Sequence, residues 1–205
     1  MRATTRRELV TGPAGRIECA VDAPAGAPRE GGDAARGVAL IAHPHPLFGG
    51  TLDNKVVQTL ARAFVELGYT AWRPNFRGVG ASEGRHDEGR GEIEDLAAVV
   101  DFLKPEKLVL AGFSFGAAVQ ARLAQRVHPE RMVLVGLAVD SFEAPPVPAD
   151  TILIHGEKDE TVPLASVLAW ALPQELPVVV VPGADHFFHR RLNVLRAIVQ
   201  HNWRR

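Results

Sequence analysis

Ser114 stands at the centre of the motif Gly112-x-Ser114-x-Gly116, between two stretches of different character. The apolar run LVLAG (residues 108–112) is typical of a buried strand, and FGAAVQARLAQ (115–125) is typical of a helix. Where a strand turns directly into a helix, the chain makes a tight bend that flanking glycines accommodate. A serine on that bend exposes its hydroxyl near the positive end of the helix. This placement suits a nucleophile, and the simpler alternative is an incidental serine in a glycine-rich turn.

A serine hydroxyl is a weak nucleophile until a base removes its proton, and the base needs a third group that orients it. Both partners must lie at the carboxyl ends of the strands, where open α/β sheets place their sites. His186 meets this condition, because it lies in the loop after the valine-rich run at residues 177–181. His189 is the competing histidine, and we favour His186 because His189 is expected to begin the last helix.

The same condition selects the carboxylate. Asp159 follows the predicted strand at residues 151–155 through a short loop and is our first candidate. Asp140 ends the apolar run that begins at residue 131, and it is the alternative that could reach the same histidine. Asp185 is adjacent to His186 in sequence, where neighbouring side chains diverge, and we interpret it as a loop residue.

Acyl transfer through a tetrahedral intermediate also needs two N–H donors for the oxyanion. The amide of Phe115, at the predicted helix start, is one of them. The other is expected from the loop His-Pro-His-Pro-Leu-Phe (43–48), whose prolines have no N–H to donate. We therefore prefer the amide of His45, with Leu47 second and Phe48 also able to donate.

Other motifs in the chain favour structural roles. His43 and His45 could suggest a metal site, but no carboxylate or cysteine lies nearby at ligand spacing, and His43 is more simply a buried residue that holds its loop. Gly78-x-Gly80 is too short for a dinucleotide fingerprint, and no phosphate-binding G-x-x-x-x-G-K-[ST] motif occurs. Arg77 is interpreted as a clamp on its loop. We expect neither a metal nor a cofactor.

Hydrophobic periodicity supplies the elements that must position these residues. From residue 37 onward strands alternate with helices, and most strands are apolar on both faces. We therefore predict an α/β fold with a mostly parallel sheet and helices on both faces. The expected strands are residues 4–11, 16–23, 37–42, 69–73, 107–112, 131–139, 151–155 and 177–181, and the expected helices are residues 53–67, 92–103, 115–127, 163–171 and 189–200.

Composition narrows the class of protein. The 205 residues carry a net charge of −1 and are 46% hydrophobic, so we expect one domain over residues 1–205, with 24–36 as a mobile loop. The balanced charge does not point to nucleic acid or a membrane as a partner. The lone Cys19 excludes an internal disulfide, and the N-terminus lacks the apolar segment of a secretory signal. These features lead us to expect a cytoplasmic protein.

The combination of motifs resembles the α/β-hydrolases. The order Ser114, Asp159, His186 is similar to the nucleophile–acid–histidine order of that family. The segments HPHPLFGG (43–50), DNKVV (53–57), RPNFRGVGASEG (73–84) and GFSFGAAV (112–119) resemble a small bacterial subgroup described as predicted carboxylesterases or dienelactone-hydrolase-like proteins. The resemblance covers about residues 16–200 and implies an α/β-hydrolase fold with a serine hydrolase activity.

Departures from the family pattern refine this expectation. Asn75 stands where many relatives have Asp, and His43-Pro44 replaces the common His-Gly. Only residues 141–149 lie where many relatives insert a lid, so no cap domain is expected. The site should be open, with walls from the aromatic residues Phe48, Phe113, Phe115, Phe142 and Phe187.

The resemblance thus implies a carboxylesterase acting on a small-molecule ester with a small or accessible acyl group. A thioesterase, lactonase, or peptidase or amidase would use the same mechanism. A binding member of the fold that no longer catalyses is the alternative from another class. The sequence does not indicate an oligomeric state.

Overall fold

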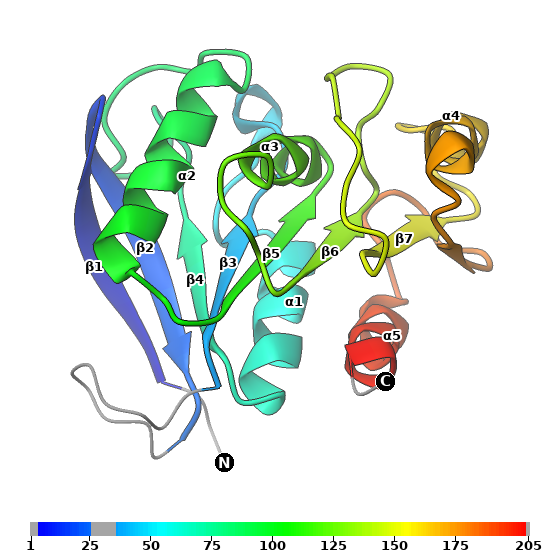
Figure 1. The fold of residues 1–205 in the computed structure, drawn as a ribbon, viewed down its shortest axis with the longest axis horizontal. Coiled ribbons are helices and arrows are strands. Elements are labelled where there is room, and N and C mark those ends of the chain that lie inside the picture. The colour runs from blue at the N-terminus through cyan, green and yellow to red at the C-terminus, as the bar shows by residue number, and fades with distance from the viewer. Residues whose placement is uncertain (1–3, 26–35, 204–205) are drawn as a thin grey trace.

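The computed structural model describes residues 4–25 and 36–203, and most of the loop expected at 24–36 lies outside these ranges. One eight-stranded sheet forms its centre, in the spatial order β1-β2-β4-β3-β5-β6-β7-β8 (Figure 1). The strands are β1 (Thr4–Gly12), β2 (Gly15–Ala23), β3 (Val38–Ala42), β4 (Thr70–Pro74), β5 (Leu108–Phe113), β6 (Arg131–Val135), β7 (Ile152–Gly156) and β8 (Val178–Val181).

Parallel pairing dominates this sheet, as predicted. β1 and β2 form an antiparallel hairpin, and β2 pairs antiparallel with β4. From β4 to β8 every neighbouring pair is parallel. All residues of β5 and β7 are buried, which explains why both strands read as continuous apolar runs and not as alternating ones.

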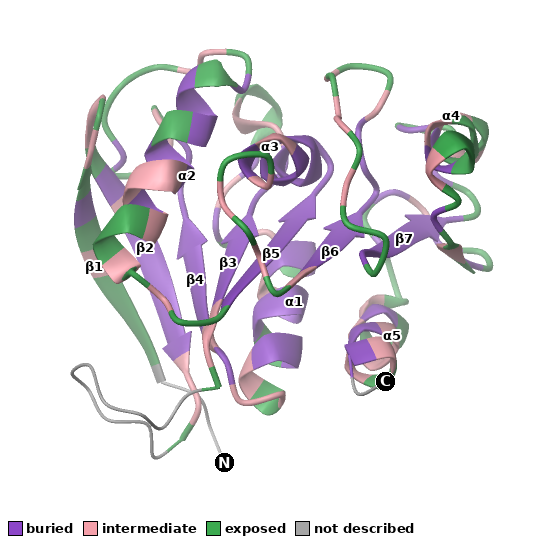
Figure 2. Ribbon diagram, viewed as in Figure 1, coloured by how far each residue is buried: buried purple, intermediate pink, exposed green. Residues whose placement is uncertain are grey.

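Helices cover both faces of the sheet, also as predicted. One face packs against α1 (Lys55–Glu66) and α5 (Leu192–Trp203), and the other against α2 (Arg90–Leu103), α3 (Phe115–Leu123) and α4 (Leu164–Ala171). In Figure 2 the central strands are buried. The helix α2, which covers them, has both buried and exposed residues. The described residues include no helix long and apolar enough to cross a membrane.

The C-terminal ends of β6 and α3 differ from the predicted ones. β6 ends at Val135 and not at residue 139, because the chain turns away at Gly136, where φ is 54°. α3 ends at Leu123 and not at residue 127, because the amides of Gln125 and Arg126 bond to carbonyls only three residues back. Hydrophobic character continues past both ends, so the pattern alone could not locate them.

The last helix begins later than expected. α5 starts at Leu192, while the prediction placed its start at His189. Phe188 and Arg190 have φ values of 54° and 59°, which a helix cannot accommodate. His189 therefore belongs to the loop between β8 and α5.

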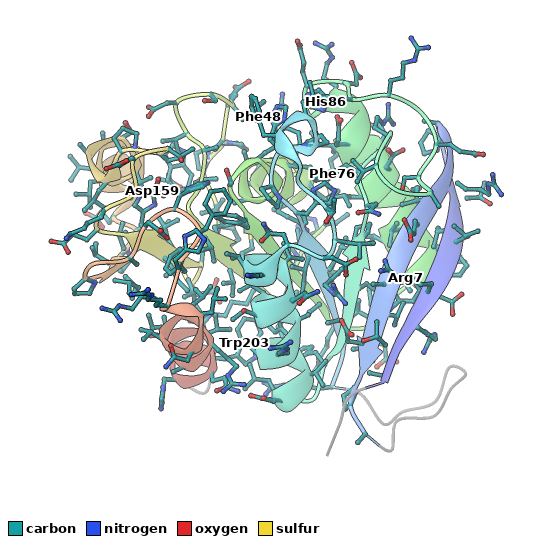
Figure 3. The ribbon with its side chains drawn as sticks, turned by 180° about the vertical axis from the view of Figure 1, so that it is seen from behind. Arg7, Phe48, Phe76, His86, Asp159 and Trp203 are labelled. Carbon is teal, nitrogen blue, oxygen red and sulfur yellow. The ribbon has the colours of Figure 1, made fainter. Side chains whose placement is uncertain are left out.

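The carboxyl ends of the parallel strands meet at one edge of the molecule. In Figure 3, Asp159, Phe48 and His86 lie toward this upper edge, and Trp203 lies toward the opposite end. The loops after β3, β5, β7 and β8 all emerge here. The fold thus collects at one edge the segments that carry the candidate residues.

Candidate active site

Ser114 lies on the turn between β5 and α3. Its φ of 56° and ψ of −119° are rare for a residue with a side chain, and such strain costs about 1–3 kcal/mol. Gly116 makes the close turn feasible, because a Cβ at that position would collide with the carbonyls of Ala42 and His43. The amide of Ser114 donates to the carbonyl of Val135 at 2.9 Å, which ties the bend to β6. The hydroxyl is therefore held at the N-terminus of α3.

Ser114, His186 and Asp159 form a hydrogen-bonded chain. His186 Nε2 lies 3.1 Å from Ser114 Oγ, and His186 Nδ1 lies 2.7 Å from Asp159 Oδ2. Ser114 comes from the turn after β5, Asp159 from the loop after β7 and His186 from the loop after β8. All three residues are buried. The structure thus brings together the three residues that we selected as nucleophile, base and acid.

Several groups hold Asp159 in its charged form. Burial alone would raise the pKa of Asp159, but hydrogen bonds from His186 and from the amide of Val162 outweigh it and lower that pKa below its ordinary value. Asp159 Oδ1 accepts from the amides of Thr161 and Val162 at 2.9 and 2.8 Å. Oδ2 is left to face His186, so the imidazole keeps its Nδ1 proton directed at the carboxylate.

The rival candidates lie elsewhere. Asp140 is exposed and makes no side-chain hydrogen bond or ion pair within residues 4–25 and 36–203. His189 pairs with Asp185, and its side chain is 67% exposed. The geometry therefore favours Asp159 over Asp140, and His186 over His189.

The candidate oxyanion donors separate into free and occupied amides. Among the described residues, the amides of Phe115 and His45 donate to no protein atom. The amide of Leu47 donates to His45 Nδ1 at 3.2 Å, and the amide of Phe48 donates to the carbonyl of His45. These bonds form the 3₁₀ turn η1 (Pro46–Phe48). The amide of Leu47, our second choice, is therefore already engaged, and that of Phe48 is occupied as well.

His43 is the buried residue that holds this loop, as we expected. Its Nε2 accepts a hydrogen bond from the amide of Phe76 at 2.9 Å, and its Nδ1 contacts the carbonyl of Pro44 at 2.6 Å. Burial lowers the pKa of His43 from 6.5 to about 4, so the ring is neutral at pH 7. Because both ring nitrogens are occupied, His43 has none free for a metal ion.

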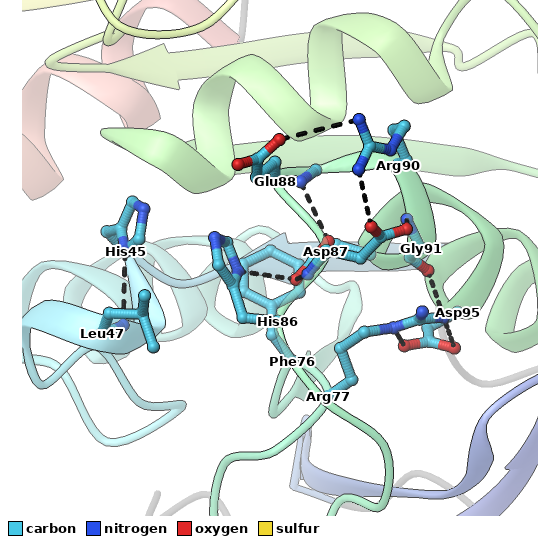
Figure 4. Close-up of polar contacts among 12 residues, drawn as sticks. His45, Leu47, Phe76, Arg77, His86, Asp87, Glu88, Arg90, Gly91 and Asp95 are labelled. Carbon is cyan, nitrogen blue, oxygen red and sulfur yellow. Dashed lines mark hydrogen bonds and ion pairs between the residues drawn. The ribbon is translucent and has the colours of Figure 1, made fainter.

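Arg77 is the clamp that the sequence indicated. Its guanidinium makes two 2.8 Å bonds to Asp95 and one 2.7 Å bond to the carbonyl of Gly91 on α2 (Figure 4). The loop after β4 is thereby fixed to α2.

Asn75 makes two contacts that an aspartate could not make together. Its Oδ1 accepts from the amide of Leu52 and its Nδ2 donates to Glu18 Oε2, both at 2.8 Å. The second contact requires an N–H group. The side-chain amide is thus matched to Glu18. It joins the loop after β4 to β2 and to the segment that holds Leu52.

The predicted aromatic walls fall into two classes. Phe48 is 87% exposed and Phe187 is 45% exposed, and Phe142 is half-buried with its ring 4.6 Å from that of Phe115. Phe113 has no exposed surface and packs beneath His186 with a ring distance of 4.8 Å. Our expectation that Phe113 lines an open wall was wrong, because its ring turns into the core from the end of β5.

His155 is a residue near the site that the sequence analysis did not identify. It lies fully buried near the end of β7, its Nε2 is 2.9 Å from the carbonyl of Val162, and the same atom is 3.5 Å from Asp159 Oδ2. Burial lowers the pKa of His155, so the ring is neutral and supports the loop that presents Asp159. A histidine at a strand end, four residues before the candidate acid, was the available signal.

Taken together, these contacts can support proton transfer. A neutral His186 can accept the proton of Ser114 Oγ at Nε2 while Asp159 stabilises the imidazolium that results. The free amide of Phe115 directly follows the serine, and the free amide of His45 comes from the loop beside it. Arrangements of this kind transfer acyl groups.

Comparison with known proteins agrees with this geometry. Residues 40–150 match the family model described as the alpha/beta hydrolase family. An uncharacterized protein of Rickettsia prowazekii (strain Madrid E) is 36% identical over 173 residues, which cover 74% of this chain and 71% of that protein.

Two solved structures are similar over nearly their whole length. A serine hydrolase without a lid from Xanthomonas campestris is 36% identical with a TM-score of 0.88, over 100% of this chain and 95% of that one. An alpha-beta serine hydrolase homologue from Coxiella burnetii is 38% identical with a TM-score of 0.85, over 98% and 99% of the two chains. In this protein too, no helix stands between β6 and β7, where a lid would be inserted. The chain therefore belongs to the alpha/beta hydrolase family, among its serine hydrolases without a lid.

Proposed function

We propose that this protein is a carboxylesterase that hydrolyses esters with small or accessible acyl groups through an acyl-enzyme. Ser114 Oγ attacks the ester carbonyl and His186 Nε2 takes its proton. His186 then gives that proton to the departing alcohol, while Asp159 orients the imidazole and balances its charge. Water, activated by the same histidine, releases the acid and regenerates the serine.

The amides of His45 and Phe115 serve as the oxyanion hole in this scheme. Backbone donors aimed at the developing negative charge stabilise the tetrahedral intermediate, and one such donor is worth about 10²–10³ in kcat. Both amides lack a protein acceptor within the described residues, whereas those of Leu47 and Phe48 are occupied. This contrast supports His45 as the second donor.

One observation carries the proposal. The buried chain of contacts from Ser114 Oγ through His186 to Asp159, at 3.1 and 2.7 Å, provides the nucleophile with a base and the base with an orienting carboxylate. The strained backbone of Ser114 supports the same reading, because strain of this kind persists where function requires a fixed geometry. The absence of a lid favours small or accessible acyl groups over long buried chains.

Labelling with a fluorophosphonate probe tests the nucleophile. Ser114→Ala should abolish labelling and reduce kcat for p-nitrophenyl acetate by about 10⁶-fold, a loss typical of a missing serine nucleophile. Ser166→Ala on α4 is the matched control and should behave as wild type. Full labelling of Ser114→Ala would contradict the assignment of the nucleophile.

A panel of acyl donors tests the substrate class. Matched acetyl esters, thioesters, lactones and anilides share the mechanism and differ in the leaving group, so kcat/KM for each identifies the preferred bond. The proposal expects the esters to be hydrolysed fastest. Faster turnover of thioesters, lactones or amides would reassign the substrate, and wild-type protein that no fluorophosphonate labels would favour a binding role.

A further inference from the structure

A second buried histidine–carboxylate pair lies beside the oxyanion loop. Glu92, in the first turn of α2, is fully buried. Its carboxylate accepts from His86 Nδ1 at 2.8 Å and from the amides of Asp87 and Gly89 at 3.0 and 2.9 Å. A buried carboxylate is costly unless donors surround it, so these bonds fix both Glu92 and the ring of His86. Nothing in the proposed mechanism uses this pair.

The ring of His86 touches the side chains of both proposed oxyanion donors. Its centroid lies 4.7 Å from that of His45 and 5.5 Å from that of Phe115. Figure 4 shows His86 beside His45. The pair formed by His86 and Glu92 thus reaches the two residues whose amides are free.

The ring of His45 is hydrogen-bonded to the backbone of its own loop. Its Nδ1 accepts from the amide of Leu47, which requires that nitrogen to be unprotonated. Burial and the neighbouring His86 lower the pKa of His45, which keeps the ring neutral. Because the ring and the loop are bonded to each other, a displaced ring carries the loop, and the amide of His45, with it.

Aromatic rings surround His45 on its other sides. Its centroid lies 4.8 Å from Phe48, 4.9 Å from Phe115 and 5.5 Å from Phe142. Phe48 is 87% exposed, so it confines the ring poorly. His86 is the neighbour that is itself anchored by a buried charge. Together with the buried ring of Phe115, it therefore supplies the fixed side of the enclosure.

We propose that His86, held by the buried Glu92, is a positioning residue for the oxyanion hole, acting through ring contacts with His45 and Phe115. The inference rests on the proposed function, because it assigns no chemical step to His86. A donor displaced by a fraction of an ångström loses part of its effect, so the expected loss is about 10-fold in kcat and not the full 10²–10³ of a deleted donor.

Two substitutions separate the ring from its hydrogen bond. His86→Asn keeps a donor for Glu92 and removes the ring, so kcat for p-nitrophenyl acetate should fall about 10-fold with KM within about twofold. His86→Phe keeps a ring but removes the bond that anchors it, so kcat should fall about threefold, less than in His86→Asn, and Tm should fall as well. Each kcat is expressed per site labelled at completion by a fluorophosphonate, which corrects for unfolded protein.

Phenylboronic acid reports on the oxyanion hole without turnover. Its tetrahedral adduct with a serine resembles the intermediate, so its inhibition constant should weaken about 10-fold in His86→Asn, in step with kcat. His189→Asn is the matched control, since it alters an exposed histidine–carboxylate pair with a 2.7 Å contact, and it should leave both quantities within about twofold.

The outcomes distinguish this inference from the proposed function. If wild-type protein is active and His86→Asn keeps its kcat per labelled site, the positioning role is wrong and the esterase assignment stands. A change confined to KM, or an equal loss in His86→Asn and His86→Phe, would also overturn it. Wild-type protein that is neither active nor labelled would overturn both.

Discussion

The loop between β8 and α5 holds two histidines with very different surroundings. His186 Nδ1 lies 2.7 Å from Asp159, and His189 Nδ1 lies 2.7 Å from Asp185. The side chains of the first pair are 5% and 0% exposed, while those of the second are 67% and 45% exposed. Contact distance therefore does not tell the two pairs apart. The two pairs differ in burial, and only His186 has a serine hydroxyl at its other ring nitrogen among the described residues.

Burial changes what such a pair can do. Solvent screens an exposed ion pair, so it contributes about 0–1 kcal/mol and fixes neither side chain. A buried carboxylate with its lone pairs committed to fixed donors holds one orientation and keeps its charge. Asp159 is bonded by the amides of Thr161 and Val162 inside the protein, whereas Asp185 is bonded by the backbone and ring of His189 at the surface. Substitutions in the two pairs therefore should have very different effects.

The largest effect is expected at Asp159. Asp159→Asn keeps the shape but presents an amide to His186, which favours the wrong tautomer and should lower kcat for p-nitrophenyl acetate by about 10⁴-fold. Asp140→Asn should leave kcat within about twofold, because Asp140 is exposed and bonded to no described residue. A large loss in Asp140→Asn alone would mean that the acid comes from the segment between β6 and β7. Steady-state kinetics of the two variants decides between them.

Asp159 should also leave a signature in the pH dependence of stability. Its pKa is lower when folded than when unfolded, so its charged form stabilises the fold above pH ~4 and this contribution is lost as the pH falls through the folded pKa. The gap in unfolding free energy between wild type and Asp159→Asn should therefore narrow between pH 7 and pH 3. Urea titrations at the two pH values measure it. A gap that widens on acidification would contradict the sign.

His43 should give the next largest effect, as a buried histidine without a carboxylate. Its pKa falls from 6.5 in the unfolded chain to about 4 in the fold, so the unfolded state binds more protons between these values. Stability is thus complete above pH ~6.5 and falls as the pH approaches 4, by about 3 kcal/mol in total. His43→Gln, which cannot titrate, should lose less stability than wild type over that range. Identical pH profiles of unfolding would exclude His43 as the source.

Much of this arrangement follows from local sequence pattern. The alternation of apolar strands and amphipathic helices predicted a parallel sheet covered on both faces. Ser114, Asp159 and His186 each follow a predicted strand. Because parallel strands end at one edge of the sheet, the three residues were expected to meet there. The prolines next to His45 limited the free amides, since they remove two donors from the loop.

What the sequence could not supply depends on contacts between distant segments. In the sequence, Glu92 looks like an ordinary residue of the first helical turn. Its pair with His86 becomes relevant to the site only because α2 lies against the loop after β3. Leu47 looked like a free donor, because the bond from its amide to the ring of His45 depends on a side-chain conformation. Phe113 is the last residue of β5, and the direction of its ring depends on which face of the sheet it joins.

Asn75→Asp would place a second carboxylate beside that of Glu18. The new carboxylate would replace an N–H donor 2.8 Å from Glu18 Oε2, which creates repulsion between like charges at a buried position. We expect a loss of about 2 kcal/mol in unfolding free energy at pH 7, with a smaller loss at pH 4, where one carboxylate is protonated. Thermal unfolding at the two pH values checks this. An equal loss at both values would show that repulsion between the two carboxylates is not its cause.

The smallest effect is expected at the exposed pair. Asp185→Asn removes the charge opposite His189 and keeps an oxygen that can accept from the amide of His189, so unfolding free energy should change by less than about 0.5 kcal/mol. The kcat for p-nitrophenyl acetate should stay within about twofold, although Asp185 adjoins His186 in sequence. Kinetics and urea titration of this one variant measure both quantities. A loss approaching that of Asp159→Asn would show that burial does not separate the two pairs, because the exposed carboxylate would then also be acting on His186.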